Sequence, residues 1–373
     1  MMKTPGLYIH IPFCRTKCPY CNFYSTTGAG KIPDFLSAVT AEMELVKKQW
    51  SAFDTVYVGG GTPSLLAPSQ VEELLSAVRT SFSILPGAEI TFEANPGDID
   101  ARYLGALREI GINRLNIGVQ SFDDGVLKFL GRRHSAAQAL SSIESARAAG
   151  FENLGLDLIF GVPGQSLRGW MDDLARAAAF APEHLSCYQL TFEQGTPLDA
   201  ARLRGEFPVH PDDELLPFFM ATSEKLERSG YSHYEISNFA REGRASMHNR
   251  KYWDHTPYLG LGPSAHSFSG NRRSWNVLRV DAYISALGRG SLPVEDGETL
   301  SPEQLRFEAL FLGLRTKRGI DLEDFRLRHG CDLLNSNGER ISFLSSRGFL
   351  NIENGRLYPT RAGMSVADTL ALL

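Results

Sequence analysis

Short runs of β-branched and other apolar residues alternate with longer helical patterns through the first half of the chain. Strands are predicted at residues 7–11, 55–58, 90–93, 115–119, 154–159 and 185–190. Between them, apolar residues recur three and four positions apart, which is the spacing of a helix with one buried face. Examples are Phe35, Val39, Met43 and Val46, followed by Val71, Leu74, Leu75 and Val78. The pattern therefore predicts six successive βα units.

Strands joined by helical crossovers form a parallel sheet, either open and doubly wound or curved into a full or partial barrel. In both, ligands bind at the carboxyl ends of the strands. The unusual polar and glycine residues of this chain fall at those ends. In strand order they are Cys14, the run Gly59 to Thr62, Glu93, Gln120 and Asp157. We therefore expect one site along this edge of the sheet.

The pattern changes after about residue 195. Residues 231–276 are expected to be rich in loops, and two helical patterns begin after Ser301. Asn354-Gly355 lies between two short apolar runs, which is a strong hairpin signal. We expect a core domain at 1–235, a loop-rich connecting segment at 236–300, and a smaller C-terminal winged-helix-like α+β domain at 301–373.

Composition and charge narrow the class of protein. Hydrophobic residues make up 43% of the chain and charged residues 22%, as in ordinary globular proteins. No stretch approaches the ~18 apolar residues of a membrane span, and no leader peptide is recognised, so a cytoplasmic protein with no transmembrane segment is expected. The net charge of −5 argues against nucleic-acid binding. Three of the five cysteines are clustered, which points to metal rather than disulfides.

The cysteine cluster is Cys14-Arg-Thr-Lys-Cys18-Pro-Tyr-Cys21. Three thiolates on one tight loop are typical ligands of an iron–sulfur cluster, and three ligands leave one iron of a four-iron cluster open. The alternative is a structural zinc site with His10 or a distant cysteine as the fourth ligand. The spacing alone leaves both interpretations open.

The cysteine spacing, with the aromatic Tyr20 directly before the last cysteine, resembles the signature of the radical S-adenosylmethionine (SAM) superfamily. The segments 8–14, 59–63, 93–96 and 118–122 are similar to the branch that contains oxygen-independent coproporphyrinogen III dehydrogenase (HemN) and the HemW-type heme chaperones. The resemblance spans the whole chain. It implies a partial (β/α)6 TIM-like barrel, a HemN-type C-terminal domain, and an external electron donor such as flavodoxin or ferredoxin.

The resemblance also implies the residues that hold the cofactors. Cys14, Cys18 and Cys21 would bind a [4Fe–4S] cluster whose open iron binds SAM. The implied SAM-contacting residues are Tyr8, Tyr20, Gly60, Gly61, Thr62, Glu93, Gln120, Arg132 and Asp157. Consecutive glycines permit close backbone approach to a ligand, although tight turns use them too. Each polar residue taken singly has a surface role as its alternative.

Two features separate the chaperone from the dehydrogenase. The fourth cysteine of the dehydrogenase branch is replaced by Phe23, and that branch's N-terminal extension ahead of Cys14 is missing. In addition, His248, Asn249, Tyr252 and Trp253 match a motif of the heme chaperones. Heme iron takes an imidazole ligand, and Arg250 or Lys251 can pair with propionates. The alternative is a buried structural histidine among aromatics that seal the barrel.

The sequence therefore predicts a heme chaperone that carries heme as cargo to an acceptor protein whose identity is unknown. The alternative is a dehydrogenase that converts coproporphyrinogen III to protoporphyrinogen IX by radical SAM chemistry.

Overall fold

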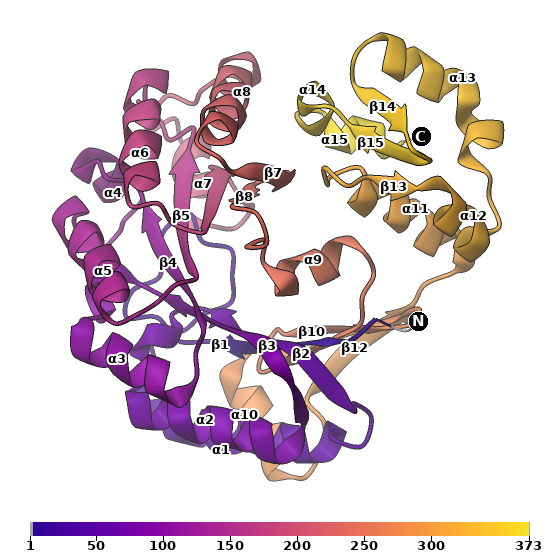
Figure 1. Cartoon of the computed structure of the whole chain (residues 1–373). Coiled ribbons are helices and arrows are strands. Elements are labelled where there is room, and N and C mark those ends of the chain that lie inside the picture. Colours follow the sequence, from indigo (N-terminus) through magenta and orange to yellow (C-terminus); the bar gives the residue numbers. More distant parts are fainter. Residues whose placement is uncertain (1–2, 373) are drawn as a thin grey trace.

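The protein is described by a computed structural model that covers residues 3–372 (Figure 1). Six parallel strands form the centre of its main sheet, and each overlaps one of the six predicted strands. They are β1 (Gly6–Ile11), β2 (Ala52–Gly60), β3 (Ser83–Ala94), β4 (Arg114–Gln120), β5 (Leu154–Phe160) and β6 (His184–Gln189). The prediction of successive βα units is confirmed.

Helices cover the outer face of this curved sheet (Figure 1). They are α1 (Ile32–Val46), α2 (Pro68–Ser81), α3 (Ala101–Ile110), α4 (Asp124–Phe129), α5 (Ala136–Ala148), α6 (Leu167–Ala179) and α8 (Asp212–Arg228). The short helix α7 (Pro197–Leu203) lies instead against the loop after β1, where the Leu198 amide donates to the carbonyl of Pro19 at 2.9 Å. The apolar residues predicted to face the core in α1 and α2 are all buried there. Burying these stripes against the sheet is the main force that holds helix to strand.

The sheet continues beyond the six central strands at both edges. On one side β9 (Tyr258–Leu261) pairs in parallel with β1, and β10 (His266–Ser269), β11 (Arg272–Asn276) and β12 (Val294–Thr299) follow in antiparallel. On the other side β8 (Asn238–Ala240) and β7 (Ser232–Glu235) follow β6. Within the described residues β12 and β7 end the sheet, so the barrel is partial and does not close.

The segment 236–300 differs from the loop-rich expectation. It contains β8 to β12 together with α9 (Met247–Trp253) and α10 (Val280–Gly288). These strands are short, and every residue of β12 is exposed, so the alternation that marks a half-buried strand is missing from the sequence. The helix α9 lies inside the curve of the sheet (Figure 1).

The C-terminal elements have a separate apolar core. They are α11 (Pro302–Gly313), β13 (Ile320–Asp321), α12 (Leu322–His329), α13 (Leu333–Ser346), β14 (Leu350–Glu353), β15 (Arg356–Pro359), α14 (Arg361–Met364) and α15 (Ala367–Leu370). The predicted hairpin is confirmed: β14 and β15 pair in antiparallel, and Asn354 and Gly355 have positive φ angles of 50° and 72°. Across residues 3–372, no helix combines the length and apolar character needed to cross a membrane.

Candidate functional site

The three clustered cysteines lie on the loop that follows β1. The Cys14 amide donates to the carbonyl of Thr26 at 2.9 Å, and the Cys21 amide donates to the carbonyl of Cys18 at 3.1 Å. All three are free thiols and partly exposed. Thr62 Oγ1 donates to Cys14 Sγ at 3.3 Å, and Arg132 Nη1 donates to Cys18 Sγ at 3.4 Å. The loop therefore presents three thiols, two of which accept hydrogen bonds from side chains of neighbouring loops, Thr62 after β2 and Arg132 after α4.

The zinc alternative loses His10, one of the two kinds of fourth ligand proposed for it. Both ring nitrogens of His10 are engaged, Nδ1 with Tyr8 Oη at 3.0 Å and Nε2 with the carbonyl of Tyr24 at 2.8 Å. Among residues 3–372, no group of three or more His, Cys, Asp or Glu side chains is placed to hold a single metal ion. A four-iron cluster spans more space than one ion, and Cys thiolates are its usual protein ligands. The donor set fits the cluster better than zinc.

A cavity of about 1140 Å³ opens beside this loop. It brings together eight of the nine positions implied for SAM, alongside Cys21. The eight are Tyr20, Gly60, Gly61, Thr62, Glu93, Gln120, Arg132 and Asp157. Tyr8 is absent from the lining, because its hydroxyl is turned to His10 beneath the loop. The cavity is larger than one cofactor requires, since small-molecule pockets commonly measure about 300–1000 Å³.

Gly60 and Gly61 form a glycine cradle, a stretch of backbone after β2 that leaves no room for side chains. Gly60 has φ +109°, and a Cβ there would lie 2.5 Å from His10 Nδ1. A Cβ on Gly61 would lie 2.7 Å from the carbonyl oxygen of Phe13. Both distances are shorter than van der Waals contact, so only glycine fits without a local shift. The backbone therefore forms the wall that runs from the cluster loop into the cavity.

Two half-buried carboxylates, Glu93 and Asp157, are held at fixed positions in the cavity wall. Tyr57 donates to Glu93 Oε1 at 2.7 Å, and Asn116 donates to Asp157 Oδ2 at 2.6 Å. Burial raises the pKa of Glu93 to about 7 and that of Asp157 to about 6. Asp157 Oδ1 and Arg132 Nε are buried without a hydrogen-bond partner among the described residues. Unpaired polar atoms facing a cavity are the arrangement expected where a polar ligand binds.

Sequence reasoning missed Tyr57 and Asn116, which orient these carboxylates. Both lie within strands, and the register places Glu93 opposite Asn116 on neighbouring β3 and β4. Side chains two positions apart point to the same face of a strand, so a polar residue inside an otherwise apolar strand faces the barrel interior. The sequence does contain this alternation: Asn116 shares a strand face with Gly118, and Tyr57 shares one with Gly59.

The four heme candidates do not share one surface. His248 is 1% exposed, and its ring nitrogens bond Thr55 Oγ1 at 2.8 Å and Tyr252 Oη at 2.9 Å. Ser246 caps the start of α9 by accepting from the backbone amide of Asn249 at 3.2 Å, and Trp253 lines a separate cleft. As placed, His248 has no free ring nitrogen and lies outside the cavity described above, so its heme-ligand role stays a prediction that requires α9 to move.

The curved parallel sheet, the three-thiol loop after β1 and the glycine cradle after β2 together define a radical SAM protein. Accordingly, residues 8–177 match the radical SAM superfamily and residues 300–366 match the HemN C-terminal domain. Membership of this superfamily implies a [4Fe–4S] cluster and SAM.

Three curated relatives identify the family within the radical SAM superfamily. The heme chaperone HemW of Mycobacterium tuberculosis is 37% identical, covering 98% of this chain and 93% of its own. HemW of Bacillus subtilis is 34% identical, covering 95% of each chain. HemW of Escherichia coli is 40% identical over 71% of each. The chain therefore belongs to the HemW family. A solved structure, coproporphyrinogen III oxidase (HemN) of Escherichia coli, has the same fold, with a TM-score of 0.85 at 24% identity, covering 100% of this chain and 90% of that one.

Proposed function

We propose that the protein is a heme chaperone, which binds heme and transfers it to an acceptor protein, and which carries a [4Fe–4S] cluster with SAM. The observation that carries the proposal is the match to HemW relatives along nearly the full chain, in a structure that gathers the cluster loop and the SAM positions at one cavity. The acceptor protein and the electron donor, for which a flavodoxin or ferredoxin is suitable, complete the proposal.

We propose that Cys14, Cys18 and Cys21 bind three irons of the cluster, and that the fourth iron takes SAM. When bound and reduced, the cluster would supply one electron to the sulfonium of SAM. The chain supplies the positioning. Thr62 and Arg132 donate to two of the thiolates, and the amides of the glycine cradle suit the methionine end of the cofactor.

The polar wall suits the other end of SAM. The free Oδ1 of Asp157 can accept from a ribose hydroxyl, because Asn116 fixes the other oxygen of the same carboxylate. Glu93 is held from two sides, by Tyr57 and by the amide of Gly60 at 3.1 Å. A carboxylate fixed in this way loses little side-chain entropy when the ligand binds.

An anaerobic heme titration of the cluster-reconstituted protein tests the proposal, with the Soret band followed for the wild type and for His248→Ala. Saturable binding is expected for the wild type. Weaker binding by His248→Ala, with a changed spectrum, would support His248 as the ligand. A wild type that binds no heme specifically would overturn the chaperone proposal.

The dehydrogenase alternative gains no support. Phe23, at the position of the fourth cysteine of that branch, is 67% exposed on the cavity rim. Incubation with coproporphyrinogen III, SAM and a reductant should give no sustained protoporphyrinogen IX. Catalytic turnover in that assay would reverse the preference.

A further inference from the structure

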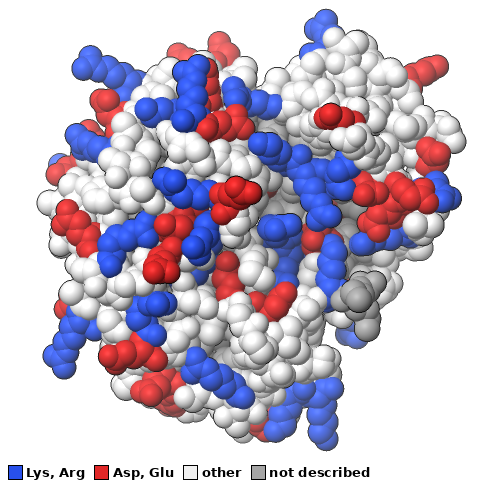
Figure 2. All heavy atoms as spheres, in the orientation of Figure 1, with Lys and Arg blue, Asp and Glu red and all other residues white. Residues whose placement is uncertain are grey.

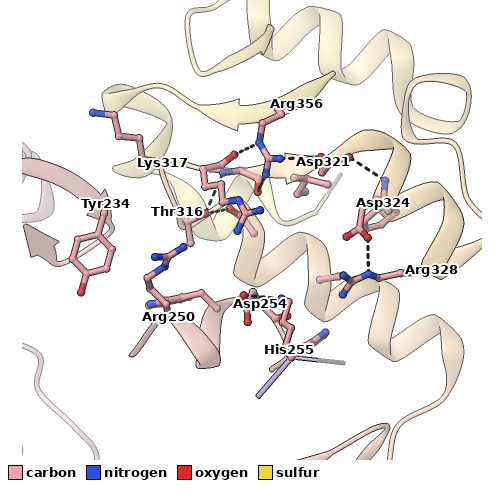
Figure 3. A pocket seen from close by; sticks show the side chains of 18 of the residues that line it. Tyr234, Arg250, Asp254, His255, Thr316, Lys317, Asp321, Asp324, Arg328 and Arg356 are labelled. Atoms are coloured by element: carbon pink, nitrogen blue, oxygen red, sulfur yellow. Dashed lines mark hydrogen bonds and ion pairs between the residues drawn. The ribbon is translucent and has the colours of Figure 1, made fainter. Parts of the chain in front are cut away.

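A second cleft, of about 670 Å³, lies between the barrel and the C-terminal elements. Its walls come from α9 and β7 on one side and from β13 and α12 on the other. Figure 3 shows Arg250 of α9 on one wall, facing Thr316 and Lys317 on the segment before β13. The cleft shares no lining residue with the SAM cavity, and its volume is within the range of ligand pockets.

The cleft carries an excess of positive charge. Of its lining residues six are Lys or Arg and three are Asp, and each Asp is paired with one of the six. The pairs are Lys3–Asp254 at 2.7 Å, Arg328–Asp324 at 2.9 Å and Arg356–Asp321 at 3.0 Å. Figure 2 shows Lys and Arg gathered around the hollow beside the C-terminal elements. In a chain of net charge −5, this local excess marks a site for an anion.

Of the three basic side chains that are not paired with these Asp residues, two are free to bind a ligand. Within residues 3–372, the guanidinium groups of Arg250 and Arg318 make no ion pair and no side-chain hydrogen bond, and both residues are exposed. Lys317 reaches Glu227 at 3.7 Å, which lies outside the cleft. Guanidinium groups bind carboxylates with two parallel hydrogen bonds, so a ligand with two carboxylates suits this pair.

The helix α9 places some of its residues toward the barrel interior and others toward the cleft. His248 faces the barrel, and Lys251 is buried against Asp54 at 2.6 Å. Arg250 and Trp253, three positions apart and hence on one helix face, line the cleft instead. The indole of Trp253 adds a flat aromatic surface next to a free guanidinium. Of the four motif residues, Trp253 therefore opens into this cleft, beside Arg250.

His329, at the end of α12, adds an available imidazole. It lines the cleft, packs on Phe325 with ring centroids 4.6 Å apart, and makes no side-chain hydrogen bond within residues 3–372. Burial and the neighbouring His255 lower its pKa, which favours the neutral ring with a lone pair on one nitrogen. Nε2 of His255 is already engaged by Glu308 at 3.2 Å.

We propose that this cleft is the heme-binding site: the macrocycle lies against Trp253, the two propionates pair with Arg250 and Arg318, and His329 is the axial ligand to the iron. The inference rests on the proposed function, because it locates the cargo of that function. It assigns His248 a structural role in α9, since both of its ring nitrogens are engaged. His248→Ala should therefore leave the heme spectrum unchanged, and a changed spectrum would favour His248 as the ligand and overturn this assignment. Coordination uses the lone pair of the neutral imidazole, so no proton is released and no electron is transferred.

The test compares ferric heme with metal-free protoporphyrin IX on the full-length, cluster-reconstituted protein. Arg250→Glu/Arg318→Glu should weaken binding of both compounds by at least tenfold, because both carry propionates. His329→Ala should change the spectrum and weaken binding of heme about tenfold, and leave the affinity for the metal-free porphyrin unchanged. The matched control is Lys48→Glu/Arg102→Glu, which makes the same charge change at exposed positions outside the cleft.

The outcomes separate the two proposals. If the wild type binds no heme, the chaperone proposal fails. If it binds heme and both cleft variants bind as the wild type does, the chaperone proposal stands and the cleft assignment is wrong. Equal weakening by the control and the cleft variants would also overturn the assignment, because overall charge alone would explain it. Unchanged affinity of His329→Ala for the metal-free porphyrin shows that this variant is folded.

Discussion

Acidification should destabilise this protein through His248, because the ring is buried in its neutral form inside the barrel. Burial lowers the pKa of His248 to about 3. In the unfolded chain the pKa of histidine is about 6.5. Below that pH the unfolded state therefore binds a proton at this histidine, whereas the folded state remains unprotonated there. The contribution of His248 to stability is therefore present above pH 6.5 and is lost progressively as pH falls toward 3.

The magnitude follows from the distance to the unfolded pKa. pH 5 lies about 1.5 units below the unfolded pKa, and each unit stabilises the protonated, unfolded histidine by about 1.36 kcal/mol. The expected loss of unfolding free energy between pH 7 and pH 5 is about 2 kcal/mol from this one residue. His248→Gln removes the titration, so its stability should fall by about 2 kcal/mol less than that of the wild type over the same interval.

Urea unfolding followed by circular dichroism at both pH values measures this difference, and other titrating groups cancel between the two proteins. Tyr252→Phe is the control: it removes one hydrogen bond to the ring and leaves the histidine in place. The control should retain the pH dependence of the wild type. A difference between wild type and His248→Gln below about 0.5 kcal/mol would refute the reasoning, because His248 would then be protonated without unfolding.

Three further predictions concern the cluster and SAM. Cys18→Ala should lose the bound iron and sulfide and the cluster absorbance; full retention of iron would refute the ligand assignment. Asp157→Asn should keep its iron and bind SAM about tenfold more weakly by calorimetry, since a charge-assisted hydrogen bond is lost; wild-type affinity would exclude a contact with Asp157. Gly61→Ala should also keep iron and lose at least tenfold in SAM affinity, because its Cβ clashes with the carbonyl of Phe13; unchanged binding would show that the backbone can shift.

The regular part of the fold is predictable because its pattern is repeated. Six buried strands alternate with amphipathic helices, and the rule that ligands bind at strand ends is enough to place Glu93, Gln120 and Asp157 at one edge of the sheet. The partners of these residues, such as Asn116, depend on strand register, which hydrophobic pattern alone does not give.

The region of α9 is less predictable for a different reason. The sequence pattern predicts a loop there, and in a loop all four motif residues can gather around one heme. Helical geometry instead puts His248 and Tyr252, four apart, on the face toward the barrel, and Arg250 and Trp253, three apart, on another face. Once the segment is helical, the spacing explains why one motif faces two environments. The spacing is present in the sequence, but the pattern that would mark the segment as helical is not.

The pairing of β9 with β1 has a consequence for synthesis on the ribosome. Strand β1 precedes the cysteine loop, and one of its edges is covered by β2 and the other by β9. About 200 residues separate the end of β2 from the end of β9, which a ribosome adds in roughly 10–40 s. During that time the second edge of β1 is open to other chains, and open strand edges are sites of aggregation. The second edge of the strand that carries the cysteine loop therefore stays unpaired until residues 258–261 have been made.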